Sequence, residues 1–461
     1  MQRLLAIAWV TWKAAFRFRL FLVLVVLLLA SVIGLPILIQ DDGTARGFTQ
    51  ILLTYTLSVI TGLLGLSTLW LACGTLARDI EECQMQVLAT KPIARWQIWL
   101  GKWMGIMTLN AALLAISGAS VYGLLQWRAG RLPADEQKVL RSEVMVARGS
   151  VGQKVDQEAI EKETERVLQE RLKTSPVENA YLPEVRRQIR EQIKGELQLV
   201  PPNAAREWDI DLGHPRTYFQ DQPLQLRIKF NTAQGSTIPT FMGEWQVGDA
   251  TSTNYWRSEA MSMSADTFHE FAIPPNLCDA NGHLTIFFLN PTTTALLFPL
   301  EDGISVLYPE GSFGLNFVRG LGIILCWLAL LTALGLTAAS FLSFPVAAFF
   351  SFALLLVGLS SGTLSDAVDN GTVAAGNEET GVMGHSAFDM FLIPAFKGLV
   401  TVINLAKSFS PIDSLSTGHS ISWTELGTAF VQIVLLLGGL IALVGIFLFN
   451  RRELATAQGT Q

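Results

Sequence analysis

The sequence predicts a polytopic α-helical membrane protein with six transmembrane helices, a re-entrant helix, and an inserted extracytoplasmic α+β domain. Three observations lead to this fold class. Half of the 461 residues are hydrophobic even without counting glycine, which is high for a soluble protein. Most apolar runs are about 20 residues long, the length of helix that spans the hydrocarbon of a bilayer. Between the third and fourth runs lies a long polar stretch that reads first as helices and then as strands.

The first membrane part covers residues 1–126. Residues 1–19 have three basic side chains in one quadrant of a helical wheel and tryptophans largely elsewhere, which is typical of an interfacial helix. The apolar run at 20–39 is longer than the core of a signal peptide, so we expect an uncleaved first span. Two further spans are expected at residues 50–76 and 104–126.

A short polar island, residues 77–103, separates the second and third spans. It holds four basic residues, and short loops rich in Lys and Arg stay in the cytoplasm. Asp79, Glu81 and Glu82 are expected to form the first turn of a helix, where negative charge meets the positive end of the helix dipole. Pro92 ends this helix, because proline disfavours helical geometry in the residue before it. We therefore expect a structured cytoplasmic hairpin.

Residues 127–313 form a large polar insertion, which the alternation of spans places outside the cytoplasm. Its first part, residues 135–200, has the composition and apolar spacing of a helical arm. Apolar and polar residues then alternate, most clearly over Leu224–Phe230 and again at His283–Leu289. Short strands with turn signals predict a β-sandwich over residues 203–312.

The second membrane part covers residues 314–461. Apolar runs at 320–337, 345–358 and 427–449 are expected to be the last three spans, although the middle run is short for a span. Residues 391–407 are largely apolar, with charges at Lys397 and the final Lys407, contain Pro394, and are expected to form a re-entrant helix. A pair of arginines follows the last span, so both termini are expected in the cytoplasm.

The sequence lacks residues that several classes of function require. The six apolar cores contain no Asp, Glu, Lys, Arg or His, which argues against a transporter driven by protons or ions. The chain has no G-x-x-x-x-G-K-[ST] loop, so we expect no nucleotide phosphates to be held by this chain. The net charge of −6 and the absence of a dense basic patch argue against nucleic-acid binding. We predict no catalytic residue.

The insertion offers one pattern that suits a metal ion. Met261 and Met263 would place two thioethers on one face of a strand, and copper(I) favours such soft ligands. Five histidines are also expected on the outer side, but no two are close in sequence and no cysteines cluster near them. Core methionines and surface histidines explain the pattern better, so we predict no metal site.

The four cysteines are far apart in the sequence. Cys73 and Cys326 lie in apolar runs, Cys83 lies in the cytoplasmic island, and Cys278 lies in the insertion. Because Cys278 alone is expected to face an oxidising compartment, no disulfide within the chain is expected.

The island from Val87 to Lys102 resembles the cytoplasmic signature of permease subunits of type-2 ABC exporters. That family shows an acidic helical stretch, a Leu-rich turn, a proline, a basic residue three positions on, and Gly-Lys at the start of the third span. Pro92, Arg95 and the Gly101-Lys102 pair occupy those positions here. The resemblance covers residues 1–126 and 314–455. The insertion departs from compact members and is similar to the subgroup associated with multicopper-enzyme maturation or gliding motility.

This resemblance implies that Asp79–Ala89 is a coupling helix, seated in a groove of a separate ATPase. A helix with an apolar stripe transmits a push if its partner grips it. The predicted ATPase-coupling residues are Asp79, Ile80, Glu81, Glu82, Val87, Leu88, Pro92, Arg95 and Lys102. The alternative is that the island is a membrane-surface elbow with no partner.

The resemblance further implies a multi-pass protein of the bacterial cytoplasmic (inner) membrane. Its partners would be an ABC ATPase subunit, a second permease in a homodimer or heterodimer, and membrane lipid, without nucleic acid. It would couple ATP hydrolysis on the ATPase to export or membrane translocation of an unknown substrate. The permease itself needs no cofactor, since ATP binds the partner.

A second class of function stays open. The chain is alternatively a membrane-anchored extracytoplasmic binding or scaffold protein whose β-sandwich recognises a glycan or a protein. A stoichiometric ATPase bound at the island would favour the permease, and its absence would favour the scaffold.

Overall fold

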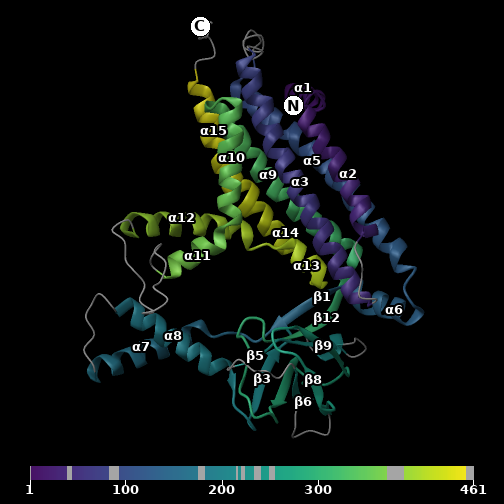
Figure 1. Ribbon diagram of the computed structural model, residues 1–461, viewed down its shortest axis with the longest axis vertical. Helices are drawn as coiled ribbons and strands as arrows, with labels where there is room; N and C mark the ends of the chain where they lie inside the picture. The colour runs from purple at the N-terminus through teal and green to yellow at the C-terminus, as the bar shows by residue number, and fades with distance from the viewer. Residues whose placement is uncertain are drawn as a thin grey trace. The chain divides into compact units, whose positions relative to one another are not determined.

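The structure is a computed structural model in which the chain divides into two compact units. The helical unit comprises Met1–Val146 and Ser312–Gln461, and the insertion unit comprises Ala147–Gly311 (Figure 1). The structure describes residues 2–38, 44–82, 93–174, 182–213, 216–219, 224–232, 240–248, 255–370 and 389–452.

Among the described residues of the helical unit, five helices are long and apolar enough to cross a membrane. They are α2 (Arg19–Leu38), α3 (Ala45–Glu81), α5 (Arg95–Ala129), α9 (Phe313–Phe341), and the continuous helix Trp423–Arg451, which comprises α14 (Trp423–Ala429), the π-helical η4 (Phe430–Gly438) and α15 (Gly439–Arg451). Each corresponds to an expected span. Several of these helices are longer than the apolar runs, because the polar residues that flank the runs are also helical.

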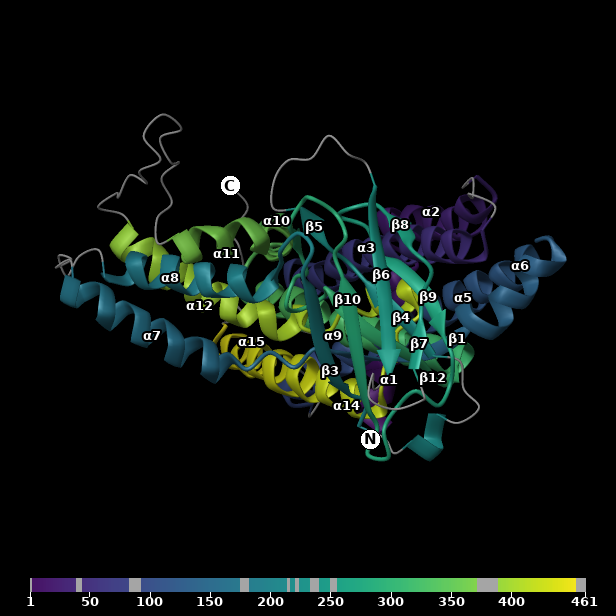
Figure 2. The same ribbon diagram turned by 90° about the horizontal axis from the view of Figure 1, so that it is seen from below.

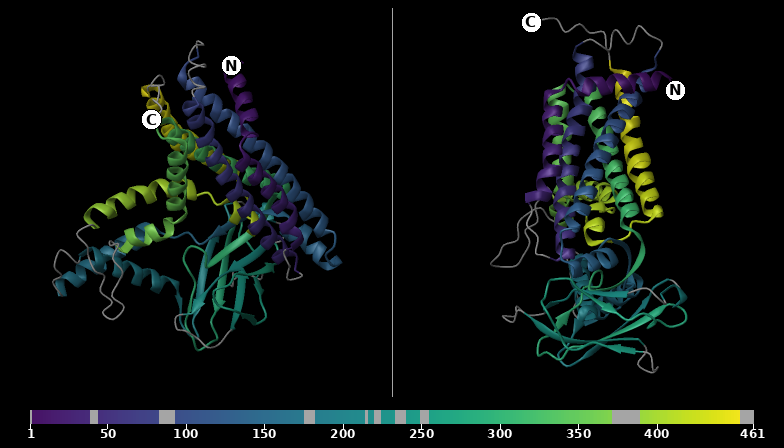
Figure 3. Two further views of the ribbon diagram at one scale, coloured as in Figure 1. Left: turned by 45° about the horizontal axis from the view of Figure 1, so that its top comes forward. Right: turned by 90° about the vertical axis from the view of Figure 1, so that its right-hand side faces the viewer.

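Shorter helices complete this unit. They are α1 (Gln2–Ala15), α6 (Ala134–Val139), the π-helical η1 (Leu140–Val144), α10 (Phe344–Leu359), α11 (Ser361–Asn370), α12 (Asp389–Lys407) and α13 (Pro411–Thr417). The α1 helix lies across the ends of the long helices in the right panel of Figure 3.

The expected fifth span differs from the other five. It is α10, whose 16 residues extend about 24 Å at 1.5 Å per residue, less than the roughly 30 Å of bilayer hydrocarbon. The expected re-entrant stretch is α12, which forms a pair with α13 that bends by 43°. Such a bent pair is either a broken span or a re-entrant loop.

The connection from α9 to α14 returns along the length of the bundle. Arg319, near the start of α9, donates from Nη1 to the carbonyl of Ile421, just before α14, at 2.7 Å. Arg452, at the end of α15, donates to the carbonyl of Ser340, near the end of α9, at 3.2 Å. The two helices therefore run in the same direction. The chain between them, which begins with α10, must return to the end where α9 starts. Figure 1 shows α11 and α12 running across the direction of α10.

Glycines in α5 allow α1 to pack closely against it. A Cβ on Gly101 would lie 2.8 Å from the Cβ of Ile7, and one on Gly105 would lie 2.8 Å from the carbonyl oxygen of Ala8. The four-residue spacing places both glycines on one face of α5. The close approach at these two glycines fixes where α1 crosses α5. Beside this crossing, Trp12 Nε1 of α1 donates to Thr108 Oγ1 of α5 at 2.9 Å.

The insertion unit has a helical pair and three sheets. The helices α7 (Gln157–Thr174) and α8 (Leu182–Gln198) lie side by side in Figure 2, and they occupy the later part of the range 135–200 that was expected to be a helical arm. One sheet has the order β1-β12-β4-β9, a second has β3-β10-β6-β7 with β8 paired to β6, and a third has β2-β11-β5.

The strand bounds follow. They are β1 (Val146–Gly152), β2 (Leu199–Val200), β3 (Ala205–Asp211), β4 (Leu224–Ile228), β5 (Asn231–Thr232), β6 (Phe241–Gly248), β7 (Tyr255–Arg257), β8 (Met261–Met263), β9 (His269–Ile273), β10 (His283–Leu289), β11 (Leu296–Leu297) and β12 (Ile304–Ser312). The strand expected at 283–289 is confirmed as β10, and the one expected from residue 224 is confirmed as β4.

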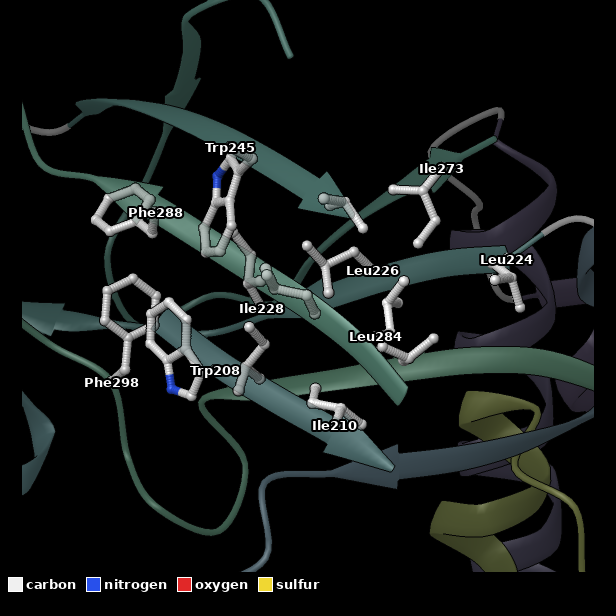
Figure 4. Close-up of a cluster of buried hydrophobic side chains, with 14 of the residues drawn as sticks. Trp208, Ile210, Leu224, Leu226, Ile228, Trp245, Ile273, Leu284, Phe288 and Phe298 are labelled. Carbon is white, nitrogen blue, oxygen red and sulfur yellow. The ribbon is translucent and has the colours of Figure 1, made fainter. Parts of the chain in front are cut away.

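Two of these antiparallel sheets share one hydrophobic core. Trp208, Trp245 and Phe288 come from the sheet of β3, β10 and β6, while Leu226 and Ile273 come from the sheet of β4 and β9 (Figure 4). Trp245 and Phe288 lie opposite each other in the β6–β10 register, with ring centroids 4.6 Å apart. The insertion unit therefore has a core of its own.

The strand β1 lies in the range expected to be helical. It pairs with β12, about 160 residues later, and such a long-range contact leaves no local periodic signal. Gly149 permits this pairing, because a Cβ there would lie 2.4 Å from Cζ of Tyr308.

Candidate functional site

The predicted coupling residues that the structure describes lie at one end of the helical unit, where α3 ends and α5 begins. Charged side chains at this end connect most of the helices that meet there. We call this cluster the charged rim, and it consists of Arg78, Asp79, Glu81, Arg95, Lys102 and Arg452.

The helix expected to begin at Asp79 does not begin there. Asp79 and Glu81 instead form the last turn of α3, which runs without a break from Ala45 to Glu81. Negative charge at the carboxyl end of a helix is unfavourable, since the helix dipole is negative there. Each of the two carboxylates is offset by a donor from another helix.

Lys102 of α5 offsets Asp79. Its Nζ lies 2.5 Å from Asp79 Oδ2 and donates to the carbonyl oxygen of Thr75 at 2.8 Å. The lysine side chain is 6% exposed and the aspartate side chain 24% exposed, so the pair is largely removed from water. Charged hydrogen bonds in such a setting are strong and specific in geometry. They fix the end of α3 against the first turns of α5.

Glu81 and Arg78 tie α3 to the start of α10. Glu81 accepts a hydrogen bond from the backbone N–H of Phe344 at 2.8 Å. That N–H is one of the donors that a helix leaves unsatisfied at its start, where a carboxylate is also favoured by the dipole. The guanidinium of Arg78 lies 4.5 Å from the Phe344 ring centroid and 4.9 Å from that of Phe18, which precedes α2. Cation–π contacts therefore connect three helix ends.

Arg95 ties the start of α5 to the end of α15. Its Nη1 donates to the carbonyl oxygens of Phe449 and Asn450, both at 2.9 Å, and of Arg452 at 2.8 Å. The last carbonyls of a helix lack partners within the helix, and a cation near them is stabilising. Arg452 continues the chain of contacts by donating to the carbonyl of Ser340 in α9.

The predicted coupling residues therefore have different partners in the structure. It brings Asp79 and Lys102 together, and it directs Glu81 and Arg95 to two other helices. Ile80 packs against the buried cluster at this end, and Glu82 is exposed. The predicted residues Val87, Leu88 and Pro92 lie outside the described residues.

The sequence did not predict that Arg78 belongs to the charged rim, or that Thr75 and Phe344 contact it. Nothing in the local pattern of a single chain indicates that a carbonyl at position 75 or an N–H at position 344 will meet a side chain from another helix. The arginine at 452 was expected to mark the inner end of the last span, and its contact with α9 adds a structural role.

The residues weighed for a metal site are in ordinary packing and hydrogen bonds. Met263 is 3% exposed in the core of the insertion unit, as a core methionine should be. His283 Nδ1 lies 3.1 Å from Asp209 Oδ2, and His269 Nε2 lies 2.8 Å from the carbonyl oxygen of Ser264. Among the residues that the structure describes, no three His, Cys, Asp or Glu side chains are grouped to hold a metal ion. His214 and His385 lie outside them.

A buried charged cluster also joins three strands of the insertion unit. Arg148 of β1 donates to Gln225 Oε1 of β4 at 2.7 Å and to Glu270 Oε2 of β9 at 2.8 Å. Arg227 is 9% exposed, and this burial lowers the pKa of its guanidinium, while Glu270 opposes the shift. This cluster fixes β1 to the sheet.

Comparisons with protein-family models, with curated proteins and with solved structures found no match to this chain. The rim can act mechanically, because it joins α3 and α5 to each other and to α9, α10 and α15.

Proposed function

We propose that the chain is the membrane-spanning permease subunit of an ATP-binding cassette transporter. It would couple ATP hydrolysis on a separate ATPase subunit to export or membrane translocation of a substrate that the sequence does not identify. The observation that carries this proposal is that the charged rim ties both ends of the 83–94 connection to the rest of the bundle.

The lengths of α3 and α5 support a mechanical role. Their 37 and 35 residues extend about 55 Å and 52 Å at 1.5 Å per residue, well beyond the roughly 30 Å of bilayer hydrocarbon. A force on the connection between them would therefore reach the bundle through continuous helices. The Asp79–Lys102 pair makes these helices move together at this end, and Arg95 passes the movement to α15.

The proposal includes a topology of six crossings. The parallel directions of α9 and the helix Trp423–Arg451 support a crossing between them that begins with α10. With the rim in the cytoplasm, the main basic clusters beside the spans lie on that side, with Arg128, Arg131 and Arg319 as exceptions, which fits the positive-inside rule. The insertion unit then lies outside, and both termini lie in the cytoplasm of a bacterial inner-membrane protein.

A paired substitution tests the docking of an ATPase. In the sequence, Leu88 belongs to the apolar stripe of the predicted coupling helix, although it lies outside the described residues. Leu88→Asp would require an unpaired carboxylate to be buried in the ATPase groove, which costs several kcal/mol. The variant should remain in the membrane at a normal level but lose the ATPase during purification. The control Gln84→Glu should keep it. If Leu88→Asp retains the ATPase at wild-type stoichiometry, the island is not the docking site.

One observation favours a second candidate function. The insertion unit has its own core of two sheets, as a binding module does. If the purified chain carries no ATPase and its insertion unit binds a glycan or a protein, the chain is instead an anchored recognition protein.

A further inference from the structure

A seam of polar side chains runs between α3 and α5 in the interior of the helical unit. On α3, Thr61, Thr68 and Thr75 recur every seven residues, which is nearly two full turns, so they lie on one face. Asp79, four residues after Thr75 and so on the same face, pairs with Lys102 of α5, so this face points towards α5. On α5, Asn110 and Ser117 are also seven residues apart.

The register of the two helices brings these side chains to the same depth. The helices are antiparallel, and the Lys102–Thr75 contact fixes their alignment. Thr68 lies seven residues before Thr75, about 10 Å along α3, and Asn110 lies eight residues after Lys102, about 12 Å along α5. Asn110 is therefore level with Thr68. By the same count, Ser117 is level with Thr61.

The side of α5 that carries Asn110 and Ser117 faces inward. Met107, one turn before Asn110, has its sulfur 3.7 Å from Thr332 Oγ1 of α9, and a Cβ on Gly118 would meet Leu321 of α9. Asn110 and Ser117 thus point between the α3 and α9 contacts of α5. Both are 1% exposed, as is Thr68.

Thr75 Oγ1 donates to the carbonyl of Ala72 at 3.4 Å, but four other polar atoms of this seam lack partners in the part of the chain that the structure describes. They are Thr61 Oγ1, Thr68 Oγ1, Asn110 Nδ2 and Ser117 Oγ. Other buried hydroxyls of α3 do have partners. Thr49 and Thr56, for example, donate to carbonyls one turn earlier in the helix. Among the described residues of α3, the two buried hydroxyls without partners, Thr61 Oγ1 and Thr68 Oγ1, therefore both lie on the face towards α5.

A buried polar group without a hydrogen bond is costly, and in a helix surrounded by lipid no bulk solvent satisfies it. At one level an amide N–H and a hydroxyl, and at the other two hydroxyls, lie at the same depth without a partner, and they provide the donors and acceptors that a buried water needs. We propose that the α3–α5 seam binds internal water at two levels, one between Thr68 and Asn110 and one between Thr61 and Ser117. This inference does not depend on the proposed function.

The test is a water-edited solid-state NMR measurement on the full chain in lipid bilayers, with asparagine labelled with ¹⁵N. Magnetisation should pass from water to the side-chain amide of Asn110, whose signal is identified by its loss in Asn110→Leu. In Thr68→Val, which keeps the shape but removes the hydroxyl, this transfer should fall several-fold. In the matched control Thr56→Val, which removes a buried hydroxyl that is already bonded to Leu52, the transfer should be unchanged.

The proposal is overturned if the Asn110 amide of the wild-type chain receives no magnetisation from water. It is also overturned if the transfer is the same in Thr68→Val as in Thr56→Val. The wild-type measurement decides the question even if Thr68→Val does not fold.

Discussion

Asp79 and Lys102 should contribute unequally to stability although they form one ion pair. The variant Asp79→Asn leaves the Lys102 ammonium in a site where its side chain is 6% exposed, with the Thr75 carbonyl as its remaining acceptor among the described residues. The variant Lys102→Met leaves the Asp79 carboxylate, which is 24% exposed and reachable by water. Methionine also keeps much of the apolar stem of the lysine.

The magnitudes follow from this difference in exposure. Removing one partner of a buried pair costs about 3–5 kcal/mol, whereas exposed pairs contribute about 0.2–1 kcal/mol. We expect Asp79→Asn to lower the free energy of unfolding by about 3 kcal/mol and Lys102→Met by about 1–2 kcal/mol. In the double variant neither charge is left alone, so its cost should be smaller than the sum by about 1–3 kcal/mol.

The assay is reversible unfolding of the purified full chain in mixed micelles, followed by tryptophan fluorescence during a titration with denaturing detergent. Four proteins complete the cycle: wild type, the two single variants and the double variant. Equal losses in the two single variants would refute the argument from exposure. Additive losses in the double variant would show that the two side chains do not interact in solution.

Three further predictions concern other parts of the chain. Gly105→Val should displace α1 and increase amide exchange there, because its Cβ would lie 2.8 Å from the Ala8 carbonyl, while the control Gly123→Ala meets nothing within 4 Å and should leave exchange unchanged. The hydrogen bond from Arg190 holds the pKa of Glu161 below its ordinary value, so the α7–α8 contact is stable at neutral pH and should weaken as the pH falls below about 4. Exchange in α7 would measure this, and Glu161→Gln should reduce the dependence on pH, with the Glu165–Arg186 pair left as the remaining contribution. A reporter that is active only outside the cytoplasm should be active when fused after Pro202 and silent when fused after Thr90, and the reverse pair of results would contradict the topology.

The helices could be predicted because their signal is local. Runs of apolar residues identified the five long helices, and the change to period-two alternation identified β4 and β10. Helix ends were less predictable. Acidic residues at 79–82 indicated a helix start, but α3 has no residue that breaks it before Glu81, and Lys102 compensates for Asp79 from another helix.

The rim itself could be predicted only in part. The resemblance and the charges pointed to Asp79, Arg95 and Lys102, yet their partners lie on helices far away in sequence. Arg95, for example, meets carbonyls about 355 residues later. The strand β1 was missed for the same reason, because its pairing with β12 spans the whole insertion unit. Contacts of this kind depend on how helices and strands assemble, which one sequence does not reveal.

The central claim is that this chain works with a separate ATPase, and the most direct test is the composition of the native complex. The full wild-type chain, extended by a terminal affinity tag, should be purified from its own membranes, and the mass and subunits of the complex should be measured. The account predicts two permease chains with two ATPase subunits, and ATP hydrolysis by the purified complex. A chain that is recovered without an ATPase, from membranes where one is expressed, would contradict it.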